Sequence, residues 1–493
     1  MSTPVIRRIL AATILLAPAG AGTPLAAQLI GVKSVPVAAG DQFLIHPSRN
    51  LGMGSVSIAL EDPLLDPFTN PAKGFRLHDA RLFGSPTFYS VSNGDGSGRT
   101  LPVGAVIGSE NWFGALSVSL QQLQGADRNR GVIFLRDVAF VEQPLSEQSA
   151  TNMYAFGMIG RKIPGSRLSI GASALYADLQ ALDGVDLLYA LSQSIEQSGH
   201  VADLRVAMAG EGEDGARYEA MLLHHRIDMT HDVTYFDWVC CVDEQFPVPR
   251  TRTETNQDQT RTWGLHLGYD RPVGSRGWRV GGILTGNVMS HPKIPNYEIM
   301  NIPRDPGNSW AYNFGVGVSR SIGPTLFGID VIYEPIWSNT WAEADSAIDR
   351  PNGGKLPKGA KTVENDFTFS NAILRTGIAR ETERWGLNLG VQVRSYRYTL
   401  EQQDNVLATR RDQDESWMEW TPSWGGTLKF PDLTIRYTGR MTTGTGRPGV
   451  AWDASVRAAA DALSSFIVAP SGPLTLQEAR VMTHQISVSL PIN

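Results

Sequence analysis

The sequence has no long hydrophobic run after its N-terminus, and it has almost no cysteine. No later stretch reaches the roughly 18 consecutive apolar residues that mark a membrane-spanning helix, which excludes a polytopic helical membrane protein. Cys240 and Cys241 are the only cysteines in the 493 residues, too few for a scaffold held by disulfides. The net charge of −6 and the lack of a basic tract argue against nucleic acid as a partner.

Recognisable catalytic and cofactor motifs are also missing. The chain has no G-x-S-x-G elbow, no H-E-x-x-H helix and no dinucleotide-binding glycine fingerprint. His224 and His225 lie near Cys240 and Cys241, but the spacing fits no standard zinc motif, and adjacent strand residues face opposite sides. We therefore predict no enzyme, no catalytic residue, no metal and no cofactor. The two cysteines form either a vicinal disulfide or a reduced pair in an exposed loop.

The N-terminus has the three parts of a secretory signal peptide. Arg7 and Arg8 precede a short apolar run, and small residues lead to a cleavage site near Ala27. The run is shorter than the roughly 20 residues of a spanning helix, although an uncleaved N-terminal anchor is the alternative. We expect residues 1–27 to be removed and the protein to be exported.

Beyond the N-terminus the hydrophobic pattern has a period of two. From Trp263 to Asp270 every second residue is apolar, and the residues between are polar or glycine; Tyr312–Ser319 and Trp385–Arg394 repeat the pattern. Such alternation over about ten residues is typical of a strand with one face against lipid or a core. After the last of these segments the phase slips, and we expect a β-bulge that keeps Tyr396 and Tyr398 on the apolar face.

The lengths of the connections favour a barrel over a soluble β-sandwich. Short turns alternate with long polar loops, as in outer-membrane barrels, whose short turns are periplasmic. Long loops are expected near 179–200, 228–259, 291–308, 340–363 and 401–413, with helices at Val185–Gln197 and Trp452–Phe466. About sixteen strands follow, near 87–92, 101–108, 112–123, 151–161, 167–178, 201–209, 216–227, 260–270, 276–290, 309–320, 324–338, 364–380, 384–400, 414–430, 432–444 and 481–492. The pattern is weakest at 87–92, 101–108 and 201–209, so the predicted fold class is all-β, an antiparallel transmembrane β-barrel of 14–16 strands.

A barrel assigns these side chains to two faces. Aromatic residues near strand ends are expected in interfacial girdles: Trp112, Trp278, Trp337, Trp417, Trp420 and Trp424. Charged residues on the polar faces are expected to look into the lumen: Arg279, Asp330, Glu334, Arg394, Arg436 and Arg440. There they set ion preference, orient a ligand or hold neighbouring strands together. The chain ends in Asn493 rather than in the usual aromatic residue, so either its assembly signal diverges or the final strand is not the closing one.

Residues 49–74 carry a motif that combines glycine, proline and a few polar residues. Its members are Arg49, Leu51, Gly52, Met53, Gly54, Ala59, Leu60, Asp62, Pro63, Asn70, Pro71 and Ala72. In order and position this motif resembles the N-terminal signature of the long-chain fatty acid transporter (FadL) superfamily, which includes PorV-type barrels attached to a secretion machine. The resemblance implies that residues 28–80 form a plug or hatch in the lumen of a barrel at 81–493, and that its movement opens a path. Lys73 departs from the family's usual glycine.

These observations together predict a protein of the bacterial outer membrane. The resemblance implies that it passes hydrophobic small molecules, such as fatty acids, by diffusion through a gated lumen. Its partners would then be outer-membrane lipid and the hydrophobic ligand. The alternative is a PorV-type scaffold that conducts nothing and docks secretion-machine proteins through loops 228–259 and 340–363.

Overall fold

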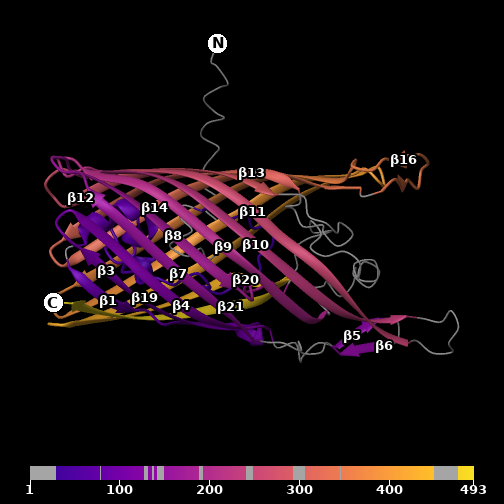
Figure 1. Cartoon of the computed structure of the whole chain (residues 1–493), viewed down its shortest axis with the longest axis horizontal. Helices are drawn as coiled ribbons and strands as arrows, with labels where there is room; N and C mark the ends of the chain where they lie inside the picture. Colours follow the sequence, from indigo (N-terminus) through magenta and orange to yellow (C-terminus); the bar gives the residue numbers. More distant parts are fainter. Residues whose placement is uncertain are drawn as a thin grey trace, which may run out of the picture.

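The computed structural model describes residues 29–77, 79–126, 132–135, 138–141, 149–187, 192–239, 248–291, 306–344, 346–448 and 476–492. Within them, seventeen strand segments form one antiparallel sheet that closes into a barrel (Figure 1). These segments are β1 (Ala80–Gly84), β2 (Thr87–Val91), β3 (Ser97–Gly108), β4 (Trp112–Gln124), β7 (Ser149–Lys162), β8 (Leu168–Leu179), β9 (Ser192–Glu211), β10 (Arg217–Val239), β11 (Val248–Val273), β12 (Trp278–His291), β13 (Gly307–Ile322), β14 (Thr325–Glu343), β17 (Lys361–Glu381), β18 (Trp385–Asp404), β19 (Thr409–Phe430), β20 (Leu433–Pro448) and β21 (Leu476–Ile492). Two small hairpins lie outside this sheet, β5 (Val132–Leu135) with β6 (Val138–Val141) and β15 (Ile348–Asp349) with β16 (Lys355–Leu356). No helix in these ranges is long and apolar enough to cross a membrane.

The barrel closes between the two ends of the chain. β21 pairs with β20 on one side and with both β1 and β2 on the other. β1 and β2 form one interrupted strand, because each also pairs with β3 and only Ser85 and Pro86 separate them. Pro86 has no N–H group to give to the ladder, which accounts for the interruption. The closed barrel thus has sixteen strands, which confirms the larger predicted number, and the final strand is the closing one.

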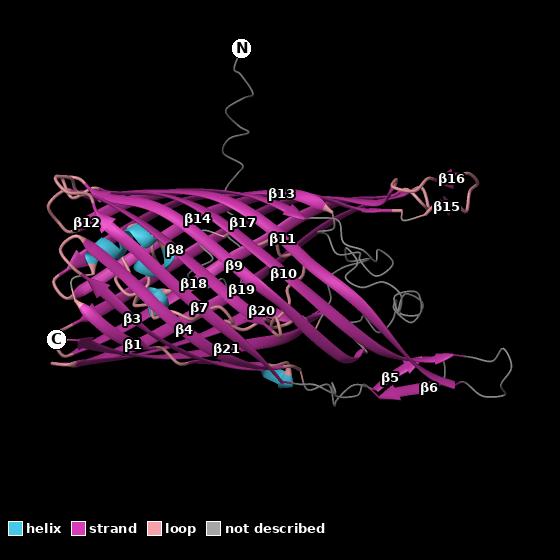
Figure 2. Ribbon diagram, viewed as in Figure 1, coloured by secondary structure: helices cyan, strands magenta, loops and turns pink. Residues whose placement is uncertain are grey.

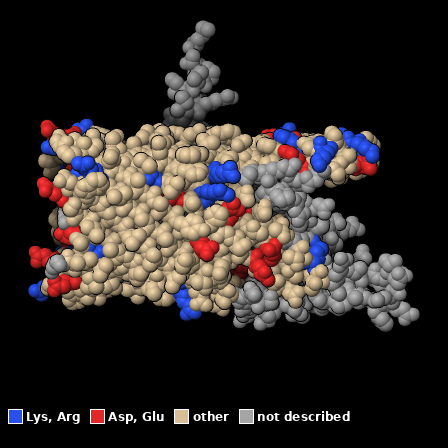
Figure 3. All heavy atoms as spheres, viewed as in Figure 1, with Lys and Arg blue, Asp and Glu red and all other residues tan. Residues whose placement is uncertain are grey.

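The outer face of the barrel carries the apolar row that the alternation predicts. On β18, Trp385, Leu387 and Leu389 are 40%, 60% and 61% exposed, whereas Gly386 and Asn388 between them are buried. Charged side chains are sparse over most of the wall and denser toward its ends (Figure 3). An apolar belt on a sheet without free edges is the surface of a membrane-spanning barrel.

The predicted bulge in β18 does not occur. The pairing of β18 with β19 runs without a shift from Trp385 to Asp404, so the same set of alternate residues faces inward throughout. Tyr396 and Tyr398 are therefore inside the barrel, at 3% and 0% exposure, and not on the lipid face. Trp417, predicted in a girdle, also lies inside and is 9% exposed. The apolar residues change phase here because the lumen wall itself becomes aromatic.

Several predicted loops are strands. β10 and β11 continue as a paired hairpin through most of residues 228–259, and this hairpin extends well past the other strand ends (Figure 1). β14 and β17 shorten the expected loop at 340–363, and only residues 405–408 separate β18 from β19. Residues 192–197, predicted as helix, belong to β9. A strand with water on both faces has no apolar row, which is why polar sequence there resembles a loop. The predicted signal peptide, Cys240 and Cys241, and the helix at Trp452–Phe466 lie outside the described residues.

Residues 29–77, called here the N-terminal segment, lie within the barrel. The segment contains three short helices, η3 (Asn50–Met53), α1 (Asp66–Thr69) and η4 (Pro71–Arg76). Figure 2 shows them in cyan near the end of the barrel that has the short turns. The segment hydrogen-bonds to side chains of strands around the whole wall: Gln121, Ser169, Arg205, Asn287, Ser319, Asp330, Asn388, Ser423, Arg440 and Gln485. Since these partners come from every side, the segment occupies the lumen.

Candidate functional site

Asp62 joins the start of the motif to its end. Its carboxylate accepts hydrogen bonds from the Ser48 hydroxyl (2.6 Å) and from the N–H groups of Arg49 (3.0 Å) and Asn50 (2.9 Å). On the other side it accepts the N–H groups of residues 64–65, at 3.1 and 3.2 Å. Asp62 is only 3% exposed, and a buried carboxylate is stable only with such donors. The motif is therefore a compact loop built around one carboxylate.

Met53 and Gly54 lie directly on the barrel wall at Gly377 and Gly390. These two glycines are a cross-strand pair on β17 and β18, and a Cβ at either would lie 2.7 Å from the Met53 Cα. Gly54 has a φ of 67°, in the left-handed region that glycine favours, and its N–H donates to the Ser423 hydroxyl at 2.9 Å. The motif thus meets the wall backbone to backbone, which only glycines on both sides permit.

The second half of the motif begins η4. The Asn70 side chain accepts a hydrogen bond from the Ala72 N–H (3.0 Å) and donates to Glu219 of β10 (2.5 Å). Pro71 takes the first helical position, where its missing N–H costs nothing. Ser169 of β8 donates its hydroxyl to the Ala72 carbonyl at 2.9 Å. This part of the motif therefore holds both its own helix and two strands of the wall.

The other motif residues have unlike surroundings. Leu51 is 2% exposed, and Gly52 packs closely against the side chain of Asn388. Arg49 donates to the Glu61 carbonyl at 2.5 Å, within the loop. Pro63 is exposed, and its ring stiffens the loop without a partner on the wall.

A row of ion pairs, called here the charge latch, joins the segment to β10, β11 and β12. Glu61 lies 2.5 Å from Arg76 of the segment and 2.6 Å from Arg217 of β10. Arg217 also pairs with Asp270 of β11 at 2.7 Å, and Asp270 pairs with Arg279 of β12 at 2.5 Å. Burial opposes the charge on Glu61, but Arg76 and Arg217 together hold its pKa below the usual value. The latch thus links three wall strands to one side of the segment.

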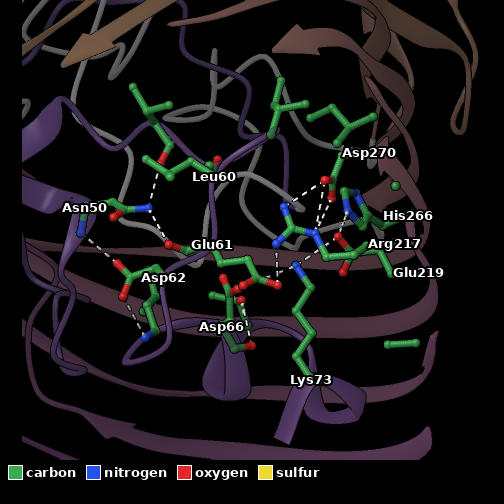
Figure 4. A pocket seen from close by; sticks show the side chains of 18 of the residues that line it. Asn50, Leu60, Glu61, Asp62, Asp66, Lys73, Arg217, Glu219, His266 and Asp270 are labelled. Atoms are coloured by element: carbon green, nitrogen blue, oxygen red, sulfur yellow. Dashed lines mark hydrogen bonds and ion pairs between the residues drawn. The ribbon is translucent and has the colours of Figure 1, made fainter. Parts of the chain in front are cut away.

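Lys73 adds a second arm to the charge latch. Its ammonium lies 2.9 Å from Glu219 and 3.9 Å from Asp66, and Figure 4 shows it pointing from η4 toward the acidic side chains. Burial raises the pKa of Asp66 to about 6. The cavity enclosed between these groups measures about 90 Å³, whereas pockets for organic ligands commonly measure about 300–1,000 Å³. This cavity is therefore smaller than such pockets.

Two of the predicted lumen charges hold the segment. Asp330 is fully buried and accepts the N–H groups of Ser57 (2.7 Å) and Ile58 (3.2 Å). Arg440, 3% exposed, donates from Nε to Asp41 at 2.6 Å. Both residues therefore satisfy polar groups of the segment on the side away from β10.

The other four predicted charges make contacts within the wall. Glu334 and Arg394 pair at 2.9 Å across β14 and β18. Arg436 donates to the Thr427 hydroxyl at 3.1 Å, and Arg279 belongs to the charge latch. Two of the six predicted lumen charges thus contact the segment, and the other four contact wall residues.

The lumen wall carries a large apolar patch on the side of β3 to β9. Here the segment residues Ile45 and Phe68 pack into a large buried cluster. The wall contributes Phe83, Val106, Phe113, Ala115, Tyr154, Phe156, Met158, Leu175, Ala177, Leu179, Val201 and Met229. The sequence pattern missed this surface, because a strand such as β7 is apolar on both faces and loses its alternation. On this side the segment therefore packs on an apolar patch, called here the apolar wall, and also accepts hydrogen bonds from Gln121, Ser169 and Arg205.

His46 is a polar side chain of the segment that is buried against this apolar cluster. It is 2% exposed and stacks on Phe68, with ring centroids 4.1 Å apart and Phe156 edge-on at 5.1 Å. Within the described chain, neither of its ring nitrogens has a hydrogen-bond partner. Burial and the nearby Arg205 lower the pKa of His46 to about 3. Docking of the segment thus requires the neutral imidazole.

Acid is expected to loosen the segment through His46. The docked histidine binds fewer protons than a free one, so its contribution is full above about pH 6.5 and is lost as the pH falls toward 3. By pH 4 the loss amounts to about 3 kcal/mol. A His46→Phe variant keeps the ring stack and lacks this response, so amide exchange at residues 43–50, corrected for intrinsic rate, should rise between pH 7 and 4 in the native protein only. Asp66 titrates in both proteins, so its effect on amide exchange cancels when the two are compared. An equal rise of exchange in the two proteins would contradict the role of His46.

A second apolar cluster of the lumen wall was not predicted as such. Its wall residues are Met289, Ala311, Ile336, Phe367, Phe369, Tyr396, Tyr398, Leu400 and Trp417. Ile30, near the start of the segment, is buried among them at 3% exposure. The change of phase after Arg394 indicates this cluster in the sequence, but the prediction placed the aromatic residues that follow it on the lipid face.

Comparisons with known proteins give a fold-level similarity. No model of a known protein family matches the chain, and no curated protein matches its sequence. Similar solved structures include the Pseudomonas putida toluene transporter TodX, a Pseudomonas aeruginosa FadL homologue and the Ralstonia pickettii toluene transporter TbuX. Their identities are 12%, 11% and 10%, and the TM-scores are 0.38, 0.45 and 0.38. The matches cover 90%, 92% and 90% of this chain and 96%, 100% and 97% of those chains. Values this low carry no argument about function, which must come from the site itself.

Proposed function

We propose that the protein is an outer-membrane barrel that passes hydrophobic small molecules by diffusion, and that residues 28–80 are its movable gate. In this proposal residues 1–27 are a cleaved signal peptide and residues 81–493 are the barrel. The partners are outer-membrane lipid and the hydrophobic ligand. The protein catalyses no reaction.

The observation that carries this proposal is the unequal attachment of the N-terminal segment. On one side it rests on the apolar wall of β3 to β9, a surface on which a hydrophobic molecule is stable. On the other side it is held by the charge latch, whose largely buried ion pairs are costly to break. A segment attached in this way can swing away from the apolar wall while its internal Asp62 loop stays intact.

Locking the segment to the wall tests the proposal. A Cβ at Gly328 of β14 would lie 3.5 Å from the Val56 Cβ, within the range of about 3.5–4.5 Å that a disulfide needs. We expect the oxidised Val56→Cys/Gly328→Cys variant to lower uptake of butylbenzene and oleate by cells at least about fivefold, since the gate can no longer move. Reduction should restore uptake.

The single variant Val56→Cys is the matched control, because it has the same residue at the gate and no partner for it. Its uptake should equal that of the native protein under both redox conditions. If the oxidised double variant takes up every hydrophobic probe at the native rate, the gate proposal is wrong. The scaffold alternative would then be preferred, with the long β10–β11 hairpin as the docking element.

A further inference from the structure

The aromatic cluster on β17 to β19 contains a buried negative charge. Tyr396 and Trp417 are stacked with centroids 4.6 Å apart and an interplanar angle of 27°. Glu419, two residues along β19 from Trp417, is 1% exposed and accepts the Trp417 indole N–H at 3.2 Å. Aromatic faces beside a carboxylate form the kind of site that binds an organic cation.

The N-terminal segment already places a cation there. The Lys33 ammonium lies 2.9 Å from the Glu419 carboxylate and 5.6 Å from the centroid of the Tyr396 ring. Three residues earlier, Ile30 is buried in the apolar part of the same cluster, and its N–H donates to Asn287 at 2.8 Å. Ile30 and Lys33 thus present an apolar group and an ammonium to one continuous surface.

The charges that remain when Lys33 leaves favour another cation. Arg394 is already paired with Glu334, through contacts of 2.9 and 3.1 Å. Arg394 is also the cross-strand neighbour of Glu419 and lies over the Tyr396 ring at 5.2 Å, so without Lys33 one guanidinium is shared by two buried carboxylates and one negative charge is left in excess. A buried carboxylate is strongly destabilised unless it is paired or protonated. An anionic ligand, such as a carboxylate, would make this worse.

We propose that Ile30–Lys33 is a tethered stand-in for a ligand, and that this site accepts hydrophobic organic cations, meaning amines or quaternary ammonium compounds with an apolar group. The inference deepens the proposed function, because the site becomes free only when the N-terminal segment moves. Ligand and segment compete for Glu419, Tyr396 and the apolar cluster. Binding of such a cation therefore favours the displaced segment.

Binding by the purified full-length barrel in non-ionic detergent tests this, with three probes that share one skeleton. 4-Phenylbutylamine is the cation, 4-phenylbutanol the neutral analogue and 4-phenylbutyrate the anion. In a Lys33→Ala variant, which frees the site, we expect calorimetry to show the amine binding at least about tenfold more tightly than the butyrate, and more tightly than to the native protein. Adding Glu419→Gln should weaken amine binding about tenfold and leave alcohol binding within about twofold.

The control is Lys429→Ala, because it removes a lysine paired with a glutamate of the wall, at 3.1 Å from Glu381, and leaves Lys33 in the aromatic site. It should bind the amine no better than the native protein does. If Glu419→Gln prevents folding, judged by the gel shift on boiling, Tyr396→Leu in the Lys33→Ala background gives the second measurement, with a loss of several-fold for the amine alone. Equal affinity of the Lys33→Ala variant for amine and butyrate would overturn the inference. If the protein prefers the cation but shows no gated uptake, this inference stands and the transport proposal is wrong. If it shows gated uptake but no preference for the cation, the transport proposal stands and this inference is wrong.

Discussion

Replacing both Gly377 and Gly390 with alanine is expected to push Met53 off the barrel wall. Each new Cβ would lie 2.7 Å from the Met53 Cα, and neither the wall nor the loop around Asp62 can yield easily. Overpacking of this kind costs about 1–3 kcal/mol per site, and the two costs are coupled because the glycines are cross-strand neighbours. Amide exchange at Asn50–Gly54 should rise at least about tenfold, and ion conductance in planar bilayers should rise with it.

Gly157→Ala is the matched control for this variant. Gly157 lies on β7 in the same barrel, and a Cβ there meets nothing within 4 Å. Its exchange and conductance should equal those of the native protein. All three proteins should keep the gel shift on boiling, since the barrel ladder is untouched. Native exchange at Asn50–Gly54 in the double variant would mean that the contact with the wall is not what holds Met53.

Replacing Asp62 with alanine is expected to unfold the motif loop without opening the barrel. The change leaves the hydroxyl of Ser48 and three backbone N–H groups without their acceptor, whereas the Leu65 N–H can still donate to the backbone carbonyl of residue 62, at 3.1 Å. Hydrogen bonds to a charged group contribute about 1.5–3 kcal/mol each, and they are not additive, so we expect a loss on the order of 3–5 kcal/mol in loop stability. Limited proteolysis within residues 48–66 should become rapid while the barrel strands stay resistant.

Asp79→Ala removes a carboxylate of another kind and serves as the control. Asp79 pairs with Arg81 at 3.0 Å, and both side chains are about half exposed, at 57% and 47%. Exposed pairs contribute little, so proteolysis should not change. Asp62→Asn keeps one acceptor oxygen and should fall between the native protein and Asp62→Ala. If Asp62→Ala is as resistant as the native protein, the carboxylate does not organise the loop.

The barrel was largely predictable because its signal is local. The alternation in Trp263–Asp270 and Trp385–Arg394 reports a wall between lipid and a polar interior, and each predicted strand is present. Where a strand does not lie between lipid and a polar interior, the alternation of apolar residues no longer reports which face is outside. Above the apolar belt, Tyr396 and Trp417 face the lumen, so the alternation rule placed them on the wrong face of the wall. The polar β10–β11 hairpin stands in water, so the same alternation rule predicted a loop there.

The site was less predictable because its contacts join distant parts of the chain. Asp62 and Gly54 could be singled out from the motif, since a glycine-rich, proline-stiffened stretch cannot be a regular strand. The partners Arg217, Glu219 and Asp270 could not, because nothing in one sequence indicates which wall charge meets Glu61. Lys73 was noticed only as a departure from a family pattern, and its pairing with Glu219 supplies the physical reason for it.

The closure of the barrel by its first and last strands dictates an order of assembly. Ala80 pairs with Ile492, nearly the whole chain apart, and such distant pairings form late because a very long loop must be closed first. The N-terminal segment precedes Ala80, so it is joined directly to the strand that makes this last pairing. The hairpins β10–β11 and β11–β12 join neighbours along the chain and close far shorter loops, so we expect them to form before the two ends of the chain meet.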